Sequence, residues 1–434
     1  MRRYALDASY QRVASDVILG GSPLRLFRLT TAGRRVADAL EEGTTLPDRH
    51  VALTDRLIDA GAIHPVPPPA TEAVTIVVPA FGRTPRLDAA GMVVIDDASP
   101  HPIDVPGATV IRLPRNGGPA AARNAGLATV TTPLVAFVDA DVVLPDGWLD
   151  PLLGHFADER VALVAPRVRT APAGSAVVDG FEAQHGSLDL GPQRARVAAG
   201  SRVSYVPAAA IVCRTAAIRA VGGFDEALRF GEDVDLDWRL VEAGWRCRFE
   251  PEVVVEHEAR PSLIGWVRQQ FDYGTSAAPL AQRHPGALAP LRVSGWSVAA
   301  WALVATRRPF AAAVLTVGTA VALQRKLRGV PPATTARLAT VGTFAAGEQL
   351  ASAISRAWWP LATVAAVWRP ARPVVAAALI APSALAAWRD RTARFAPMRL
   401  AADLAYGAGV WRGALRQRSL AVLRPDLTNW PPRR

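Results

Sequence analysis

Residues 134–141 decide the fold, and they read Leu134-Val135-Ala136-Phe137-Val138-Asp139-Ala140-Asp141. The first five are apolar and match the length of a buried strand in a parallel sheet. Two aspartates separated by one alanine follow at the end of that strand. Ligands of open α/β sheets bind beyond the carboxyl ends of the strands, so we expect Asp139 and Asp141 at a binding site. Carboxylate oxygens there can hold a divalent cation, and the cation neutralises a leaving diphosphate.

Upstream of this stretch, short β-rich runs alternate with helical runs, which is typical of a parallel sheet built from βαβ units. Strands are expected at 74–78, 91–95 and 110–113, and a helix is expected at 120–130. About a dozen residues separate the first two strands, so any helix between them must be very short. The second strand also ends in carboxylates, Asp96-Asp97.

A glycine-rich segment, 115–126, leads from the third strand into the helix. The N-terminal end of a helix favours anions, so this segment is suited to contact with a phosphate group. It is not a P-loop, because no Gly-Lys-Ser or Gly-Lys-Thr follows the glycines.

A third group of polar residues begins at Gly222-Gly223-Phe224-Asp225-Glu226 and continues into a helix expected over 232–243. In that helix Asp233 and Asp237 fall on one face, and apolar side chains fall on another. A carboxylate at the start of such a helix could take a proton from an acceptor hydroxyl.

In this order and spacing, the three groups resemble the inverting glycosyltransferases of family 2 over about residues 72 to 275. The resemblance implies an A-type nucleotide-diphospho-sugar transferase fold, which is a Rossmann-like α/β fold, and a divalent metal cofactor, Mg²⁺ or Mn²⁺. Asp233 matches the catalytic base of the family's Glu-Asp motif, with Glu232 beside it orienting the acceptor. Asp141 would bind the metal, and Asp139 would face the ribose, the nearby sugar and the metal.

The nucleotide-sugar site implied by the same resemblance draws on several strand ends and loops. Its members are Pro79 and Ala80 after the first strand, Asp97 at the base or ribose edge, Arg115 and Arg123 beside the nucleotide, and Arg268 near the diphosphate or acceptor. His257 lies where some members of the family supply a further metal ligand. Asp88 is a candidate for a carboxylate that members often carry between the first two strands.

Several of these residues also have a purely structural explanation. Asp97 could cap a turn, Arg115 and Arg123 could pair with acidic neighbours, and His257 could be a buried structural histidine. Asp235 and Asp237 are expected to be solvated or salt-bridged residues of their helix.

The resemblance implies a single in-line displacement. The acceptor hydroxyl loses its proton to Asp233 while it attacks the anomeric carbon from the face opposite the diphosphate. An α-linked donor would then give a β-linked product. Charge grows on the diphosphate as the bond breaks, so the metal and the nearby arginines matter most at that moment.

The first 65 residues are expected to form a small α+β domain, and a proline-rich linker follows at 66–71. The expected elements are two strands between 12 and 29 around Gly20-Gly21-Ser22-Pro23, a helix capped by Thr30 or Thr31, and a helix over 49–60. This pattern resembles the small peptide-binding domains of the PqqD type. The alternative is a helical or winged-helix-like appendage with no peptide partner.

The C-terminal third holds the excess basic charge. From residue 290 onward there are 20 basic residues and 4 acidic ones, whereas the net charge of the whole chain is +11. A protein that reads DNA carries its basic charge on the recognition domain, so nucleic acid is not an expected partner. Apolar runs occur at 293–306, 309–323, 357–368 and 373–388, each shorter than the ~20 residues needed to span a bilayer.

Arginines and tryptophans at the ends of these runs favour helices that lie on an anionic membrane surface. True membrane spans and a soluble helical domain are the alternatives. The two cysteines, Cys213 and Cys247, are expected to be packing residues in a reducing compartment. Arg12, Asp16 and Arg25 interrupt the N-terminal sequence, which therefore lacks the apolar stretch of a secretory signal. The expected location is the cytoplasmic face of the cell membrane.

A PqqD-like domain at 1–65, a catalytic domain at 72–285 and a helical, apolar, basic region at 286–434 together resemble the glycosyltransferases of the mycofactocin system. That resemblance implies a premycofactocin-type acceptor and a nucleotide-diphospho-sugar donor, with UDP-glucose the first choice. One alternative is a family 2 transferase that acts on envelope polysaccharide or lipid-linked acceptors. Another is an inactive membrane scaffold that binds a nucleotide sugar.

Overall fold

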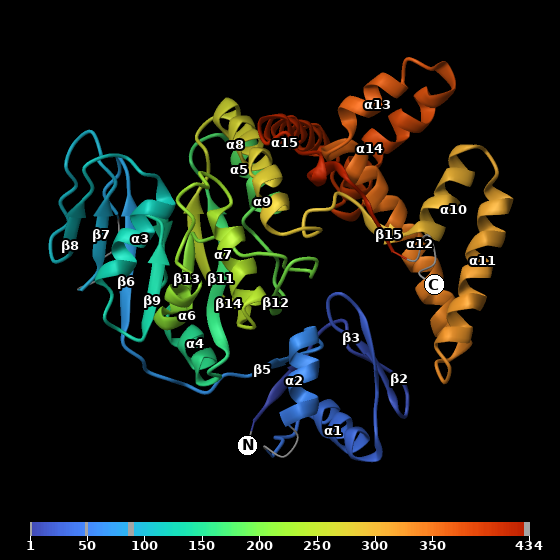
Figure 1. Ribbon diagram of the computed structural model, residues 1–434, viewed down its shortest axis with the longest axis horizontal. Coiled ribbons are helices and arrows are strands. Elements are labelled where there is room, and N and C mark those ends of the chain that lie inside the picture. The colour runs from blue at the N-terminus through green and yellow to red at the C-terminus, as the bar shows by residue number, and fades with distance from the viewer. Residues whose placement is uncertain (1, 48–50, 86–90, 429–434) are drawn as a thin grey trace. The chain divides into compact units, whose positions relative to one another are not determined.

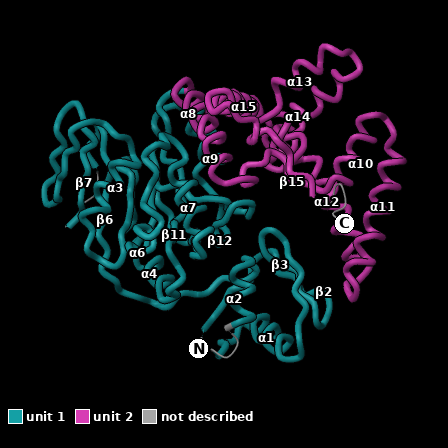
Figure 2. The backbone as a smooth tube through the Cα atoms, viewed as in Figure 1, with its two compact units in different colours: residues 1–262 teal, residues 263–434 magenta. Residues whose placement is uncertain are grey.

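The computed structural model describes residues 2–47, 51–85 and 91–428 (Figure 1). The chain divides into two compact units, Met1–Ser262 and Leu263–Arg434 (Figure 2). The first unit holds the sheet and the candidate site, and the second unit is almost entirely helical.

The centre of the first unit is a nine-stranded mixed sheet in the order β10-β14-β11-β13-β9-β6-β7-β8, with β12 paired to β14, among the described residues. The strands are β6 (Val74–Ala80), β7 (Val93–Asp96), β8 (Thr109–Arg112), β9 (Leu134–Val138), β10 (Val142–Val143), β11 (Val161–Ala171), β12 (Ala195–Val197), β13 (Ala210–Arg214) and β14 (Arg246–Glu258). Strands β8, β7, β6 and β9 run parallel, as the sequence predicts, and β13 pairs antiparallel with β9. The four predicted strands are confirmed as β6 to β9.

Helices pack on both faces of this sheet. They are α3 (Pro119–Thr129), α4 (Asp150–Leu153), a 3-10 helix η2 (Gly154–Ala157), α5 (Ala176–His185), α6 (Thr215–Ala220) and α7 (Glu232–Glu242). Strand β9 is buried on both sides because its side chains alternate between two cores: Val135 and Phe137 pack with α3, α6 and α7, and Ala136 packs with α4. The absence of alternating polarity in this strand thus follows from its central position.

Helix α3 lies very close to the sheet, and a glycine makes this approach possible. A Cβ atom on Gly126 would lie 2.2 Å from Cγ1 of Val77 in β6. Any larger residue would push the helix away from the strand, and the helix carries part of the candidate site.

The N-terminal part of the first unit contains a three-stranded antiparallel sheet, a two-stranded sheet and two helices. Its elements are β1 (Tyr4–Leu6), β2 (Gln11–Ala14), β3 (Val17–Gly20), β4 (Arg25–Arg28), α1 (Thr31–Glu41), α2 (Val51–Ala60) and β5 (Ile63–Pro65). The hairpin around Gly20-Gly21-Ser22-Pro23 is confirmed, and the Thr30 side chain caps α1 by accepting from the Gly33 N–H. The prediction of two strands is wrong, because a turn at 15–16 separates β2 from β3.

The second helix of this region ends before Gly61, as predicted, and residues 49 and 50 of the expected helix lie outside the described residues. Residues 86–90, which include Asp88, also lie outside them, and they belong to the segment in which a very short helix is expected before β7. Both cysteines are buried free thiols in the core, in agreement with a packing role.

The second unit consists of helices joined by short turns, together with one small parallel strand pair. Its elements are α8 (Leu263–Thr275), α9 (Ala277–Arg283), β15 (Arg292–Ser294), α10 (Gly295–Ala305), α11 (Pro309–Lys326), α12 (Pro332–Arg356), α13 (Trp359–Ala365), η3 (Arg369–Ala371), α14 (Arg372–Arg389), α15 (Ala396–Arg416), η4 (Ala421–Leu423) and β16 (Asp426–Thr428). The apolar runs of the sequence correspond to α10, α11, α13 and α14. Helix α12 was not expected, because its sequence mixes threonine, alanine and glycine with few large apolar residues and so contains no long apolar run.

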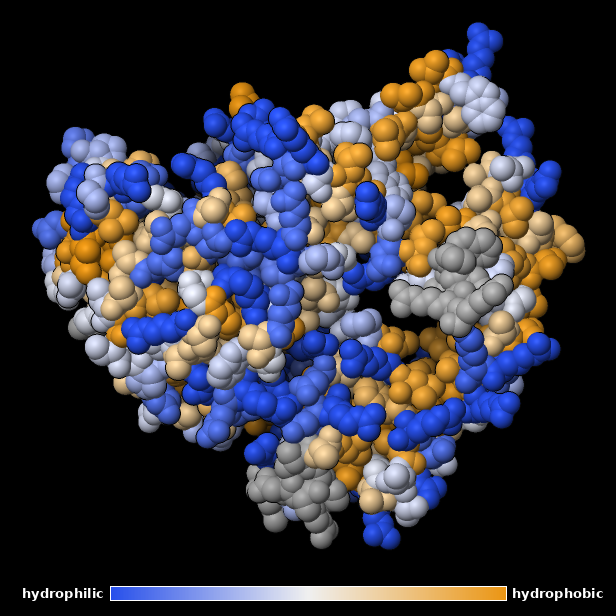
Figure 3. Space-filling view, in the orientation of Figure 1, coloured by the Kyte–Doolittle hydropathy of each residue, from blue (hydrophilic) through white to orange (hydrophobic). Residues whose placement is uncertain are grey.

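One segment of this unit, Arg369–Arg389, is long and apolar enough to cross a bilayer by length and composition, with a mean hydropathy of 1.4 over its most apolar window. The apolar run at 373–388 is itself shorter than ~20 residues, but the helical segment that contains it extends beyond the run, so the alternative of a true membrane span stays open for this segment. Only 6% of that window is buried. Figure 3 shows hydrophobic side chains gathered on the surface of the helices of this unit.

Candidate active site

Three metal-ligand side chains meet at the carboxyl end of the sheet. Asp139 and Asp141 follow β9, and His257 comes from the end of β14. The short strand β10 begins directly after Asp141 and pairs antiparallel with β14, so that Val142 lies opposite His257. One ligand atom from each of Asp139, Asp141 and His257 lies within 4.8 Å of the others. The structure therefore brings together the three residues that the sequence predicts for a metal site.

His257 and Asp141 are paired directly. Nε2 of His257 lies 3.3 Å from Oδ1 of Asp141, and both side chains are partly buried. Burial lowers the pKa of His257, but the hydrogen bond and charge of Asp141 outweigh it and raise that pKa above its usual value. Burial raises the pKa of Asp141, and the contact with His257 outweighs it, so this pKa lies below its usual value. Two oxygen ligands and one imidazole form a donor set that suits Mg²⁺ or Mn²⁺.

Arg83 and Glu258 border this cluster, and the sequence analysis missed both. Nη2 of Arg83 lies 2.6 Å from Oε2 of Glu258, and its Nη1 lies 3.9 Å from Oδ2 of Asp141. Arg83 follows the carboxyl end of β6, a position that could have pointed to it, because functional side chains gather after such strand ends. Its exposed guanidinium adds positive charge beside the two aspartates.

Arg123 on α3 connects the two halves of the site. Its Nη2 donates to Oδ1 of Asp139 at 2.7 Å, and its Nη1 donates to Oε1 of Glu232 at 2.8 Å. The guanidinium lies 5.3 Å from the ring centre of Phe224, and its Nε has no hydrogen-bond partner among the described residues. Burial lowers the pKa of Arg123, but the two carboxylates outweigh it and raise that pKa. Arg123 thus pairs with acidic neighbours, which was the structural explanation considered for it. These neighbours, Asp139 and Glu232, are themselves predicted residues of the site.

The candidate base, Asp233, lies at the start of α7 next to Glu232. Gly231 precedes them with a φ of 78°, a left-handed conformation that favours glycine and turns the chain into the helix. Oδ1 of Asp233 accepts from its neighbour's N–H, and Oδ2 accepts from the N–H of Ala208 at 3.4 Å. Burial raises the pKa of Asp233. Burial and the charge of Asp233 raise the pKa of Glu232 to about 7, although Arg123 opposes this.

Two further aspartates of α7 have structural roles. Asp235 is buried and forms a salt bridge with Arg239 at 2.6 Å, which confirms the prediction that it is a salt-bridged residue of its helix. Asp237 is not solvated and forms no salt bridge with any described residue, so the expectation for it is wrong. It is fully buried and accepts from the N–H of Val206 at 2.7 Å. Asp233 and Asp237 lie on one face of α7, as predicted, and both hold the segment 206–208.

Asp97 supports the glycine-rich loop between β8 and α3. Its two carboxylate oxygens accept from the N–H groups of Gly117 and Gly118 at 2.7 and 2.8 Å, and the side chain is buried. The turn-capping explanation therefore describes its contacts within the chain. Each carboxylate oxygen has a second lone pair that can still accept from a ligand.

The remaining predicted residues lie in different settings. Pro79 and Ala80 end β6 beside β7, where Ala80 pairs with Asp96. Arg115 is exposed on the loop that leads into α3. Arg268 lies on α8 in the second unit, where its exposed side chain is 3.9 Å from Asp272. Its relation to the site stays a prediction.

Comparison with known proteins adds to this geometry. The family model of glycosyl transferase family 2 matches residues 92–217. The chain is 42% identical over 453 residues to proteins named pre-mycofactocin glycosyltransferase from two strains of Mycobacterium tuberculosis, and the match covers 96% of each chain. This chain belongs to glycosyltransferase family 2. It is therefore an enzyme, a hexosyltransferase, rather than an inactive scaffold.

A shorter match links this family 2 glycosyltransferase to the succinoglycan biosynthesis protein ExoA of Rhizobium meliloti, at 32% identity over 26% of this chain and 38% of that protein. Two solved structures are also similar. One is a mannosyltransferase from Pyrobaculum calidifontis with GDP-Man and Mn²⁺, at 19% identity, 74% of this chain, 89% of that chain and a TM-score of 0.37. The other is GalNAc-T7 with UDP, GalNAc and Mn²⁺, at 15% identity, 56% of this chain, 61% of that chain and a TM-score of 0.33.

The family and the strand order agree on the fold. The core is the A-type nucleotide-diphospho-sugar transferase fold, with a parallel-rich sheet covered by helices and a helical region at the C-terminus.

Proposed function

We propose that this glycosyltransferase transfers glucose from UDP-glucose to premycofactocin and gives a β-linked product by inversion. The observation that carries the proposal is the 42% identity to pre-mycofactocin glycosyltransferases over 96% of both chains. This match extends over the N-terminal and C-terminal regions as well as the catalytic core, which supports a shared acceptor. The match to the succinoglycan protein covers only 124 residues, so it supports shared core chemistry and says little about the acceptor.

In this proposal the chain has four parts: a PqqD-like peptide-binding domain at 1–65, a linker at 66–71, the catalytic domain at 72–285 and a membrane-associated region at 286–434. The three-stranded sheet and two helices of the first part support the PqqD-like assignment. An acceptor derived from a peptide would give such a domain a role in acceptor binding. Removal of residues 1–65 should then raise the KM for the acceptor and leave the KM for the donor unchanged.

Asp139, Asp141 and His257 are the residues that would hold a divalent cation. These residues fit such a cation, because their three donor atoms are of suitable chemistry and lie within 4.8 Å of one another. A bound Mg²⁺ or Mn²⁺ would supply charge neutralisation at the diphosphate of the donor.

The donor is proposed to lie along the carboxyl ends of β6, β7 and β9. Pro79, Ala80 and Asp97 would border the base and ribose, and Arg115 would contact the nucleotide from the exposed loop. Arg123 holds Asp139 in position through its 2.7 Å hydrogen bond, so its role toward the donor would be indirect. Arg268 is proposed to reach the diphosphate or the acceptor.

Asp233 is proposed to accept the proton of the acceptor hydroxyl. Its raised pKa supports this role, because a base whose pKa approaches the working pH binds a proton readily in the transition state. Glu232, held by Arg123, would orient the acceptor hydroxyl toward Asp233. The hydroxyl oxygen then attacks the anomeric carbon opposite the diphosphate, and configuration inverts in one step.

We also propose that the second unit binds an anionic membrane surface on the cytoplasmic side. Its helices expose large apolar side chains, among them Phe310 at 82% and Trp368 at 70%. Arginines alternate with these side chains and would meet acidic headgroups. Vesicles that contain phosphatidylglycerol should carry the protein to the top of a density gradient at low salt, and phosphatidylcholine vesicles should carry much less.

The acceptor is tested with purified protein, UDP-glucose labelled with ¹³C, Mn²⁺ and premycofactocin, followed by mass spectrometry. We expect the acceptor to gain one or more labelled hexose units, with the β linkage visible from the anomeric proton coupling. Parallel reactions with GDP-mannose and with lipid-linked or polysaccharide acceptors test the alternatives. Transfer to an envelope acceptor without transfer to premycofactocin would discard the acceptor and keep the glycosyltransferase.

A further inference from the structure

A polar pocket lies at the opposite end of the sheet from the candidate active site. It is a cavity of about 190 Å³ between α2 of the N-terminal region and the first residues of β14, lined in part by Ile58, Asp59, Arg196 and Arg248. His257 lies nine residues beyond Arg248 in the same extended strand, roughly 25–30 Å away at the rise of a β-strand. A ligand in this pocket would therefore not touch the catalytic carboxylates.

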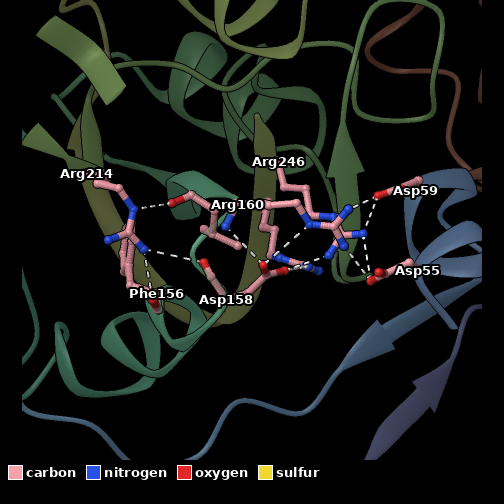
Figure 4. Close-up of polar contacts among 9 residues, drawn as sticks. Asp55, Asp59, Phe156, Asp158, Arg160, Arg214 and Arg246 are labelled. Atoms are coloured by element: carbon pink, nitrogen blue, oxygen red, sulfur yellow. Dashed lines mark hydrogen bonds and ion pairs between the residues drawn. The ribbon is translucent and has the colours of Figure 1, made fainter. Parts of the chain in front are cut away.

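The acidic side chains around the pocket are already shared by two arginines (Figure 4). Arg246 lies within 3.0 Å of Asp55 and 2.7 Å of both Asp59 and Asp158. Arg160 lies 2.5 Å from Asp55 and 3.9 Å from Asp158. These contacts join α2 to the catalytic sheet, and they neutralise much of the negative charge around the pocket.

Two other arginines that line the same pocket are compensated more weakly. Arg248 is buried, and among the described residues its side chain donates from Nη2 to Oδ2 of Asp158 at 3.4 Å, a longer contact than those of Arg246. Arg196 is partly buried, and within the described part of the chain its side chain makes no hydrogen bond or ion pair. Burial and the nearby charge of Arg25 lower the pKa of Arg196, and the charge of Asp59 opposes them without outweighing them. A guanidinium carries five N–H donors, so both side chains have donors to spare.

Buried positive charge that is only weakly paired is costly, and a small oxyanion would lower that cost. The planar guanidinium fork matches the oxygens of a phosphate group, and two forks from adjacent strands can hold one such group. Ile58, Val197 and Trp245 add apolar surface to the lining of the pocket, and such surface strengthens nearby charged contacts by lowering the local dielectric constant.

We propose that the pocket lined by Arg196 and Arg248 is a binding site for a phosphate group, separate from the donor site. The source of the group is either free inorganic phosphate or the phosphate of a nucleoside diphosphate. Because Ile58 and Asp59 belong to α2, a bound phosphate also holds the N-terminal region against the catalytic sheet. The ligand is thus a component of the junction between the two regions.

The test is calorimetric titration of the full chain with inorganic phosphate in buffer freed of divalent metal by a chelating resin. We expect saturable binding at one site, weakened about tenfold or more in Arg196→Gln, because one charge-assisted fork is lost. Arg196→Lys, which keeps the charge without the fork, should lie between the two. The matched control is Arg35→Gln, which alters an exposed arginine of α1 and should bind phosphate as the parent does.

A second readout separates binding from misfolding. Phosphate should raise the Tm of the parent and of Arg35→Gln but not that of Arg196→Gln, whose Tm without phosphate should equal or exceed that of the parent. The same titrations with UDP identify the source of the phosphate group. If Arg196→Gln weakens the binding of inorganic phosphate but not that of UDP, the ligand is the free ion. If it weakens the binding of both, the nucleotide is a ligand as well. Equal affinity of parent and Arg196→Gln, or no saturable binding by the parent of either ligand, would overturn the proposal.

Discussion

Arg123 and Glu232, which are 109 residues apart in the sequence, are joined by a 2.8 Å hydrogen bond between Nη1 and Oε1. The same guanidinium reaches Asp139 at 2.7 Å, so one buried cation holds an acidic group from each half of the site. Arg123 therefore positions the aspartates after β9 and the carboxylates of α7 together, and a change at Arg123 should alter the position of both groups.

Replacement of Arg123 should destabilise the protein. Arg123→Gln leaves Glu232 and Asp139 without their cation, and breaking a buried pair in this way costs about 3–5 kcal/mol. Urea unfolding followed by tryptophan fluorescence measures the loss. Arg35→Gln, at an exposed arginine, should change the free energy of unfolding by less than about 0.5 kcal/mol. If both variants unfold at the same urea concentration, the bridge is not a source of stability.

Removal of the candidate base should abolish turnover without abolishing donor binding. Asp233→Asn keeps the shape of the side chain but cannot accept the proton, so we expect kcat to fall about 10²- to 10⁴-fold. Product formation by mass spectrometry gives kcat, and calorimetry with UDP gives the Kd. Glu159→Gln alters an exposed carboxylate of the same unit and should keep full activity. Retention of more than a tenth of the activity in Asp233→Asn would exclude it as the base.

The acidic limb of the pH profile should report on the Glu232–Asp233 pair. Burial and the charge of Asp233 raise the pKa of Glu232 to about 7, and burial also raises the pKa of Asp233. The base must be ionised to work, so kcat/KM should rise with pH up to about neutrality and fall below it. Because the two groups titrate together, the limb belongs to the pair.

Glu232→Gln removes one member of this pair, together with its negative charge. The pKa of Asp233 should then fall, and the acidic limb of kcat/KM should move to lower pH while the maximum rate also drops. Profiles of parent and variant are compared from pH 5 to 8.5 with saturating metal. A limb at the same pH in both proteins would show that another group controls it.

Metal affinity should depend on His257 and Asp141. His257→Ala or Asp141→Asn removes one of the three donor atoms, and we expect the Kd for Mn²⁺ to rise at least about tenfold. The electron paramagnetic resonance signal of free Mn²⁺ measures this directly, in the presence of UDP. Asp150→Asn, at an exposed aspartate of α4, is the control and should bind as the parent does. Equal Mn²⁺ binding in all four proteins would place the metal elsewhere.

The sequence predicts the fold and the metal cluster well because both depend on local pattern and on one general rule. Leu134–Val138 is a strand with the predicted bounds, the rule that ligands gather at strand ends predicts Asp139 and Asp141, and the resemblance to family 2 adds His257, which the structure places beside them. Contacts between distant segments could not be predicted in this way. Asp237 looks like a surface residue by spacing, yet its partner, Val206, lies 31 residues away, and the partner of Arg83 lies 175 residues away.

Strand β14 begins with Arg246 at the junction with the N-terminal region and carries His257 one residue before its end. Side chains alternate along a strand with a period of two. Loss of one residue from 254–256 would turn His257 to the opposite face of the sheet and leave Arg246 where it is. The place of His257 at the site therefore depends on the length of β14, and also on whether an even or an odd number of residues separates His257 from Arg246. Substitutions along β14 preserve the orientation of His257, whereas insertion or deletion of a single residue near the end of the strand does not.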